Sequence, residues 1–231
     1  MITLNQEKLE KLQKLKIELL HNLFVKNRKN QPKIRLENFF DDWVTLKLGD
    51  VAPLRGGYAF KSAKFKEVGT PIIRISNITD NGNIRGDYVY YNSDPHYEKF
   101  SLETGDTLVA MSGATTGKVG TIMPTDYTKF YQNQRIGYFT RTKKIHYYFL
   151  STWLKSSHFE KLLSRLLVAG TQPNISAKDI DSLPICIPYS FKEQEGISLL
   201  FKNIDSLIDN HQQKVEGLIQ LKNTYLQNLF I

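Results

Sequence analysis

A glycine-rich stretch at residues 112–118 has residue types that bind phosphate. Gly113 and Gly117 are followed by Lys118, as in a nucleoside triphosphate loop. Such a loop has one more residue between its glycines, however, and Val119 stands where it needs the Ser or Thr that binds Mg²⁺. A nucleotide site is therefore not expected. The hydroxyls and the ammonium of this stretch suit the phosphates of a nucleic-acid backbone, unless the stretch is only a glycine-rich hairpin.

Three further polar loops carry side chains that recognise nucleic acids. Residues 132–135 and 170–174 are rich in Gln and Asn, which pair with adenine in the major groove, and Arg135 suits guanine. Residues 55–64 combine glycines with basic residues and Tyr58. Each loop alone could be an ordinary polar turn, an interpretation favoured for Gln134. Together they predict DNA contacts by Arg55, Tyr58, Lys61, Lys64, Ser112, Thr115, Thr116, Lys118, Gln132, Asn133, Arg135, Thr171, Gln172 and Asn174.

The motifs of a self-contained enzyme on nucleic acid are missing. There is no Pro-Pro pair, which amino-methyltransferases need to grip a flipped base. No Asp or Glu is followed two positions later by Lys, the spacing of common metal-dependent nucleases, and His-Glu-x-x-His is absent. The single cysteine, Cys186, excludes a disulfide framework and a multi-thiolate zinc site. No catalytic residue, metal or cofactor is expected.

The net charge of +8 over 231 residues is unevenly distributed. The excess of Lys and Arg lies in residues 1–191, whereas residues 192–231 are nearly neutral. A polyanionic partner is favoured, because Lys and Arg release counterions from a phosphate backbone; a modestly basic protein without such a partner is the alternative. No apolar run could span a membrane, and residues 1–11 lack a signal-peptide core, so we expect a cytoplasmic protein without membrane contact.

Two helices are expected to frame these loops. Residues 192–230 contain no proline, and their apolar residues follow a heptad pattern over more than four heptads. Residues 4–24 have the same character, and residues 9–24 are identical to residues 215–230 at eight of sixteen positions. This match indicates an internal repeat, the alternative being chance similarity between leucine-rich helices.

We expect the two helices to pack antiparallel rather than parallel, because a globular domain separates them in the chain. The contacting residues should be Leu9, Leu12, Leu19 and Leu23 with Ile197, Phe201, Ile204 and Ile208. Roughly half of the longer apolar stripe should then lack an intramolecular partner and bind another protein.

The chain divides into four segments on these patterns: a helix at residues 1–24, a linker at 25–42, a β-rich domain at 43–190 and a long helix at 191–231. Within the domain we expect one helix at 146–167 and strands at 72–76, 88–91, 107–111, 119–123, 136–140 and 185–187. The expected fold class is α+β, with one β-rich domain flanked by long helices that form an antiparallel coiled-coil-like pair.

Several short motifs occur in a fixed order along nearly the whole chain. They are Trp43-x-x-x-x-Leu48-Gly49-Asp50, Arg55-Gly-Gly, Pro71-Ile-Ile-Arg-Ile, Gly105-Asp106, Ser112-Gly-x-x-x-Gly117-Lys118, Asn133-Gln134, Gly170-Thr-Gln, Leu183-Pro-Ile-x-Ile-Pro188 and Glu193-Gln194. In their order and spacing they resemble the specificity subunits of type I restriction–modification systems. The resemblance implies that residues 43–190 are a target-recognition domain. It also implies that this chain binds double-stranded DNA beside methyltransferase subunits and an ATP-dependent restriction subunit, with no catalysis of its own.

Full subunits of that family have two target-recognition domains, each followed by a long helix, and the antiparallel helices set the distance between two half-sites. This sequence has one such domain and resembles the C-terminal half. A natural half-subunit, an interrupted gene and a recombination cassette all fit, and a second copy or a separate half-subunit could supply the other domain. A helical protein–protein adaptor and a stand-alone DNA-modifying enzyme are the alternative functions.

Overall fold

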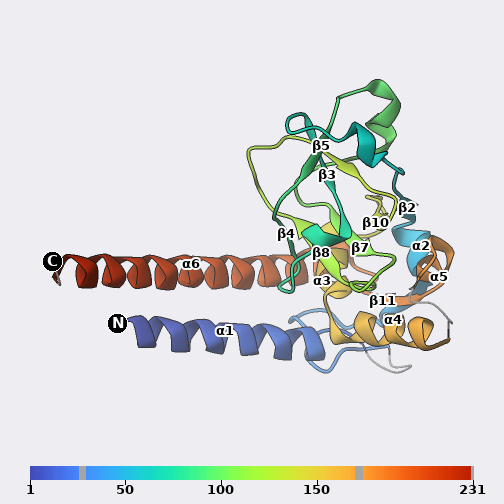
Figure 1. Ribbon diagram of the computed structural model, residues 1–231. Helices are drawn as coiled ribbons and strands as arrows, with labels where there is room; N and C mark the ends of the chain where they lie inside the picture. Colours follow the sequence, from blue (N-terminus) through green and yellow to red (C-terminus); the bar gives the residue numbers. More distant parts are fainter. Residues whose placement is uncertain (26–29, 170–173, 230–231) are drawn as a thin grey trace.

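Two long helices lie side by side and project from a β-rich body, with both ends of the chain at the far end of the pair (Figure 1). The computed structural model describes residues 1–25, 30–169 and 174–229. Helix α1 spans Ile2–Asn22 and helix α6 spans Phe191–Leu229. Lys16 pairs with Asp205, and Phe24, farther along the chain, stacks on the earlier Phe201, so the helices are antiparallel as expected. None of the helices described is long and apolar enough to cross a membrane.

The contact between the two helices is less buried than expected near the start of α1, whereas a longer part of α6 is covered than expected. Of the expected contact residues, Leu23, Ile197, Phe201 and Ile204 are buried, and Leu9, Leu12, Leu19 and Ile208 are half-buried. The expectation that half of the long stripe would be bare was wrong in extent, because the β-rich body covers the first turns of α6 and α1 covers the next ones. Every side chain from residue 219 to residue 227 is exposed.

A five-stranded sheet forms the middle layer of the body. From edge to edge its strands are β2 (Leu54–Gly56), β10 (Ile136–Phe139), β7 (Thr107–Ala110), β8 (Val119–Ile122) and β4 (Asn83–Ile84). Strand β10 is antiparallel to both β2 and β7, β7 is antiparallel to β8, and β8 is parallel to β4. The ends of β2 and β7 therefore lie at the same edge as the starts of β10, β8 and β4.

A second sheet and a short ribbon complete the β structure. The four strands of the second sheet are β5 (Val89–Tyr91), β3 (Thr70–Ile73), β9 (Phe130–Gln132) and β6 (Ser101–Leu102). The ribbon pairs β1 (Val44–Lys47) with β11 (Pro184–Ile187). The remaining helices are α2 (Leu48–Val51), α3 (Tyr147–Leu154), α4 (Ser157–Ala169), α5 (Ala177–Asp181) and the 3₁₀ turns η1 (Ser62–Lys64), η2 (Ile75–Asn77) and η3 (Pro95–Phe100).

The middle sheet separates two apolar cores, because side chains alternate between the faces of a strand. Val109 faces the helices and belongs to the larger core, together with residues of α3, α4 and α6. Its neighbours Leu108 and Ala110 face the second sheet and pack with Ile73 and Phe130. A third, aromatic cluster covers the outer side of the second sheet around Tyr131.

Most of the expected strands are confirmed, with ends shifted by one to three residues, but two expectations were wrong. Residues 75–77 form the turn η2, not the end of a strand. The helix expected at 146–167 is two helices, because the Ser156 hydroxyl accepts a hydrogen bond from the Phe159 amide at 3.4 Å and starts a new one.

The carboxylate of Glu193, in the first turn of α6, is buried and fully paired. It accepts hydrogen bonds from Arg35, with Nε at 2.8 Å and Nη2 at 2.9 Å, and from the Trp43 indole at 3.3 Å. The hydrogen bond to Glu193 is the main cause that raises the pKa of Arg35. One turn further, a Cβ at Gly196 would lie only 2.8 Å from a methyl carbon of Leu36. Glycine thus lets the segment before the domain cross close over α6.

Lys155 follows α3 and is largely buried beside the helix pair. Burial is the first cause that lowers its pKa to about 8, and the positive charge of Lys16 acts in the same direction. Asp205 and Asp209 of α6 oppose this shift without cancelling it. The ammonium is therefore held in the folded protein at a cost in stability.

Replacing Lys155 with Met should stabilise the fold at pH 7 by roughly 1–3 kcal/mol, because the desolvated charge is removed. The pKa is lower in the folded chain than its ordinary 10.5, so the penalty is complete below about pH 8 and fades toward pH 10.5. The stability gap between variant and wild type, measured by thermal unfolding, should narrow over that range. Lys178→Met, at an exposed site, is the control; a Lys155→Met protein no more stable at pH 7 would contradict the expectation.

Candidate nucleic-acid interface

Three of the four loops expected to contact DNA meet at one edge of the middle sheet. Strand register places Gly56 at the end of β2 beside Gly137, and Ala110 at the end of β7 beside Ile136. Backbone hydrogen bonds extend the contact: the Met111 amide donates to the Arg135 carbonyl at 2.9 Å, and the Ile175 amide donates to the Met111 carbonyl at 2.9 Å. The second bond also brings the end of the fourth loop to this edge. We call this edge, residues 56–58, 111–118, 133–135 and 174–175, the recognition rim.

The loop between β7 and β8 is a compact turn. Gly113 and Gly117 have φ values of +86° and +88°, a region that strongly favours glycine. The Thr116 hydroxyl donates to the Gly113 carbonyl at 2.6 Å and closes the turn. Ser112 and Thr115 are half-buried, and the Thr115 hydroxyl has no hydrogen-bond partner among the described residues. The Thr115 hydroxyl is thus unpaired but buried beneath the surface of the turn.

Lys118 closes this loop and pairs with Asp80, in the turn before β4. The ammonium and the carboxylate are 2.5 Å apart, and their side chains are 40% and 93% exposed. The hydrogen bond to Lys118 is the main cause that lowers the pKa of Asp80. Exposed pairs of this kind are weak in water. A phosphate oxygen can therefore replace Asp80 as the partner of Lys118 at little cost.

Arg55 and Gln132 take part in the structure rather than in the exposed rim. The Arg55 guanidinium donates to Gln132 Oε1 at 3.1 Å and to the Ser101 carbonyl at 2.8 Å, and it lies 4.6 Å from the centre of the Tyr138 ring. Burial is the first cause that lowers its pKa. Gln132 is fully buried, and its amide donates to the carbonyls of Arg55 and Ile136. The expectation that Gln132 reads bases is corrected, because its side chain cannot reach a ligand.

The turn at residues 133–135 is more accessible than Gln132. Asn133, expected to contact DNA, is instead buried, and its side chain accepts a hydrogen bond from the Arg135 amide at 3.3 Å, so it shapes the turn. Arg135 and Gln134 are exposed. A Cβ at Gly57 would lie 2.1 Å from the Asn133 carbonyl oxygen, so only glycine lets these two loops touch.

Tyr58 and the two lysines after it differ in their surroundings. The half-buried Tyr58 ring packs against Phe60, Tyr97 and Phe100, with centroids 5.0–5.2 Å apart. Lys61 and Lys64 are exposed at the two ends of η1, outside the sheet. Among the other predicted residues, Asn174 is exposed, and Thr171 and Gln172 lie outside the described residues.

Arg74 is a rim neighbour that the sequence analysis did not select. It follows β3, which is parallel to β9, and the Asn133 amide donates to the carbonyl of the preceding Ile73 at 3.2 Å. On its other side, Ile75 lies under Gly113 of the β7–β8 loop. Arg74 Nε is buried with no partner in the described part of the chain. The signal for it was a lone Arg directly after the buried run Pro71-Ile-Ile.

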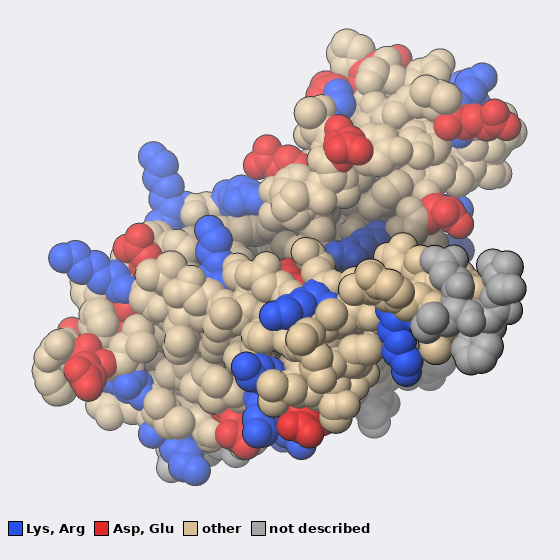
Figure 2. All heavy atoms as spheres, turned by 90° about the vertical axis from the view of Figure 1, so that its left-hand side faces the viewer, with Lys and Arg blue, Asp and Glu red and all other residues tan. Residues whose placement is uncertain are grey.

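Some Lys and Arg side chains lie in a hollow of the surface, and others are spread over the part of the molecule below it (Figure 2). The hollow lies below the upper lobe, which contains β3 and β5 in Figure 1, and the outer surface of that lobe carries acidic side chains as well. Within the described ranges, no cluster of three or more His, Cys, Asp or Glu side chains could hold a metal ion. The arrangement offers hydrogen-bond donors to an anionic ligand.

Comparisons with known proteins agree on one family. The family model "Type I restriction modification DNA specificity domain" matches residues 40–220. The type I restriction enzyme MjaVIII specificity subunit of Methanocaldococcus jannaschii is 28% identical over 98% of this chain and 55% of its own length. The crystal structures of the HsdS subunit from Thermoanaerobacter tengcongensis and of a type I S subunit from M. genitalium have TM-scores of 0.61 and 0.62.

The similarity to these two structures shows a shared fold. Sequence identity is 16% and 17%, and the matches cover 97% and 99% of this chain but 52% and 58% of those chains. The chain thus spans about half the length of the relatives that it matches.

Replacing Gln132 with Leu should destabilise the fold by roughly 1–3 kcal/mol, because two buried carbonyls and the Arg55 guanidinium lose their partner. Unfolding in urea measures the effect, and Gln134→Leu, two residues on and exposed, is the matched control that should change little. A Gln132→Leu protein of unchanged stability would show that the buried amide is not needed.

Proposed function

Because the chain belongs to the family of type I restriction modification DNA specificity domains, we propose that it recognises one half of a DNA site. In this proposal it directs methyltransferase and restriction subunits to that half-site. The observation that carries the proposal is the recognition rim, where separate polar loops of the matched region meet at one sheet edge. A duplex laid along such an edge is contacted by several loops at once.

The rim offers two kinds of contact. Ser112 and Lys118 suit phosphate oxygens. The Thr115 hydroxyl and Arg74 Nε are unpaired but buried, so a phosphate reaches them only when the loop at residues 112–118 shifts. Arg135 and Asn174 have exposed side chains of the types that read base edges. Thr171 and Gln172 belong to the same proposed base-reading loop as Asn174. Phosphate contacts fix the position of the domain, and base contacts select the sequence.

We assign no catalytic step, metal or cofactor to this chain. Methyl transfer and ATP-dependent restriction belong, in this proposal, to the partner subunits, and the chain acts in the cytoplasm, where those subunits meet DNA. The sequence motifs for such chemistry are missing, and the rim presents donors rather than a nucleophile with a base.

The outer part of the helix pair is the proposed surface for assembly. Leu221, Tyr225 and Leu226 of α6 are 44–62% exposed, and a shallow groove beside Leu12 and Leu15 runs along α1. Apolar side chains on an exposed helix surface favour a protein partner. The methyltransferase subunits are the first candidates. A second copy or a separate half-subunit would add another recognition domain, and a second copy would make the full site a spaced palindrome.

The phosphate contact of Lys118 is tested by two opposite changes. Lys118→Ala should weaken binding of the assembly to all duplexes alike and reduce the slope of log affinity against log salt by roughly one unit. Asp80→Asn releases the ammonium and should strengthen binding. Lys129→Ala is the matched control, because Lys129 also forms a 2.5 Å pair, with Glu98, but lies at the opposite end of β9.

Fluorescence anisotropy over a range of salt concentrations measures all three variants. Equal effects of Lys118→Ala and Lys129→Ala would show that the rim is not the DNA surface. An assembly whose affinity does not fall with salt would favour a protein adaptor instead.

Base reading is tested on the sites that the assembly methylates. Arg135→Ala and Asn174→Ala should each relax the choice of base at one position, by roughly 1–3 kcal/mol of discrimination, while the other positions stay the same. Sequencing of methylated DNA gives the result directly. Lys178→Ala, exposed on α5, should leave the site unchanged. If both rim variants methylate the original site with full fidelity, these side chains do not read bases.

A further inference from the structure

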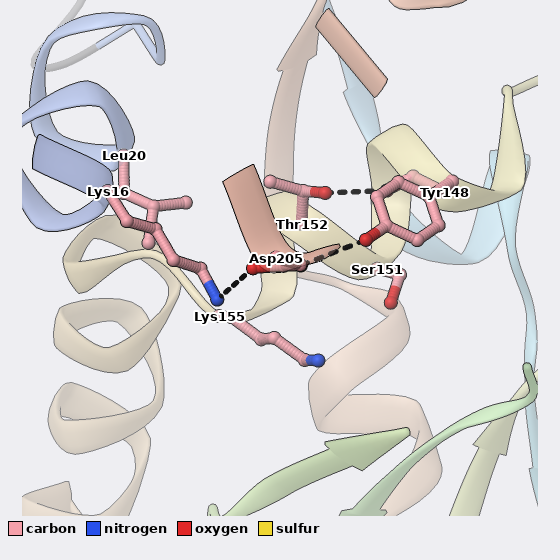
Figure 3. A pocket seen from close by; sticks show the side chains of 7 residues that line it. All are labelled: Lys16, Leu20, Tyr148, Ser151, Thr152, Lys155 and Asp205. Carbon is pink, nitrogen blue, oxygen red and sulfur yellow. Dashed lines mark hydrogen bonds and ion pairs between the residues drawn. The ribbon is translucent and has the colours of Figure 1, made fainter. Parts of the chain in front are cut away.

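A small polar cavity lies where α1, α3 and α6 meet (Figure 3). Its volume of about 10 Å³ is that of a single water molecule. The lining includes two ammonium groups, from Lys16 and Lys155, and one carboxylate, from Asp205. Burying charged groups where three helices meet costs desolvation free energy that apolar side chains would not, so these groups are expected to have a specific role.

Asp205 is the residue that joins the three helices. Its Oδ1 lies 2.6 Å from the Lys16 ammonium of α1, and its Oδ2 accepts a hydrogen bond from the Tyr148 hydroxyl of α3 at 2.9 Å (Figure 3). The two oxygens of one carboxylate therefore attach different helices to α6. Burial, and then the charge of Asp205, raise the pKa of Tyr148, so its hydroxyl remains a donor at any physiological pH.

Helix α3 is in turn fixed to the recognition domain. The Thr107 hydroxyl of β7 donates to the Ser151 hydroxyl at 2.8 Å, and Thr121 of β8 lies 3.3 Å from the same oxygen. The side chain of Lys155 reaches the loop before β4, where a Cβ at Gly82 would lie 3.7 Å from its Cε. The same loop carries Asp80, the partner of Lys118 on the recognition rim. A shift of α3 would thus move the sheet that carries the rim.

We propose that Asp205 is a positioning residue that sets the angle between the helix pair and the recognition domain. The consequence for DNA modification rests on the proposed function; the angle itself does not. From Asp205 to Leu229 the helix continues for about 36 Å, so a tilt of about 10° at the joint moves its end by about 6 Å. A target base displaced by far less than that loses much of its reactivity toward a bound enzyme.

The joint is tested first on the chain alone. Spin labels at Glu10→Cys on α1 and Lys99→Cys on the domain, both exposed, report the distance between the two bodies in a Cys186→Ser background. Asp205→Asn, Lys16→Met and Tyr148→Phe should each widen the measured distance distribution, by about twofold for Asp205→Asn. Lys14→Met, an exposed change on the same helix, should leave it unchanged. Circular dichroism verifies that each variant is folded. Because Tyr148→Phe removes a hydroxyl and no charge, a wider distribution in all three variants cannot be a general effect of altered net charge.

The second test uses the assembly with methyltransferase subunits and a cognate duplex. Asp205→Asn and Tyr148→Phe should lower kcat for methylation by about tenfold, with KM for DNA and the methylated sequence unchanged. A merely unstable chain would lose DNA affinity as well. Unchanged distance distributions in both variants overturn the proposal, as does an equal loss in KM and kcat. A wild-type assembly that methylates no specific site would refute the proposed function instead, and the distance measurement would still decide the role of Asp205.

Discussion

The buried carboxylate of Glu193 is the interaction on which the arrangement of the two bodies depends. A charge out of water must be paired, because an unpaired one costs several kcal/mol. Its partners, Arg35 and Trp43, both come from the segment between α1 and the domain, so that segment must cross the start of α6. Just after α1, Phe24 packs between Phe149 and Phe201, so α1 runs back along α6. The antiparallel pair thus follows from one buried ion pair and the aromatic contacts beside it.

The recognition rim follows from strand direction in the middle sheet. Antiparallel neighbours place the end of one strand beside the start of the next, so loops that are far apart in sequence meet at one edge. Glycine at position 57 then allows backbone contact with residue 133. Beneath the rim, the Arg55 guanidinium donates a hydrogen bond to Gln132, and the Gln132 amide donates to the Ile136 carbonyl, so strands β2, β9 and β10 are joined there. Exposed residues such as Arg135 are presented on that support.

The sequence predicted the parts of this fold that have a long periodic signal. The heptad pattern predicted both long helices, and the six predicted strands end within three residues of the observed ones. The two-residue strands β4 and β6 are too short to show a periodic pattern, and the sequence analysis did not predict them. The sequence also could not show that Gln132 is buried, because its burial depends on β9 pairing with the distant β3. The polar types expected at the site were present, but type alone does not separate a base-reading amide from a structural one.

Polar groups that bond to other elements of the fold differ from exposed polar groups in how freely they can be replaced. Changing Gln132, Glu193 or Asp205 disturbs partners on other elements, so such positions resist change. Changing the exposed Arg135 side chain removes no hydrogen bond to another side chain within the described part of the chain, so it costs the fold little. The backbone of Arg135, not its side chain, makes the contacts to Met111 and Asn133. Because Arg135 is held in place through its own backbone, its side chain can be exchanged without loss of these contacts, as the proposed base-reading role requires.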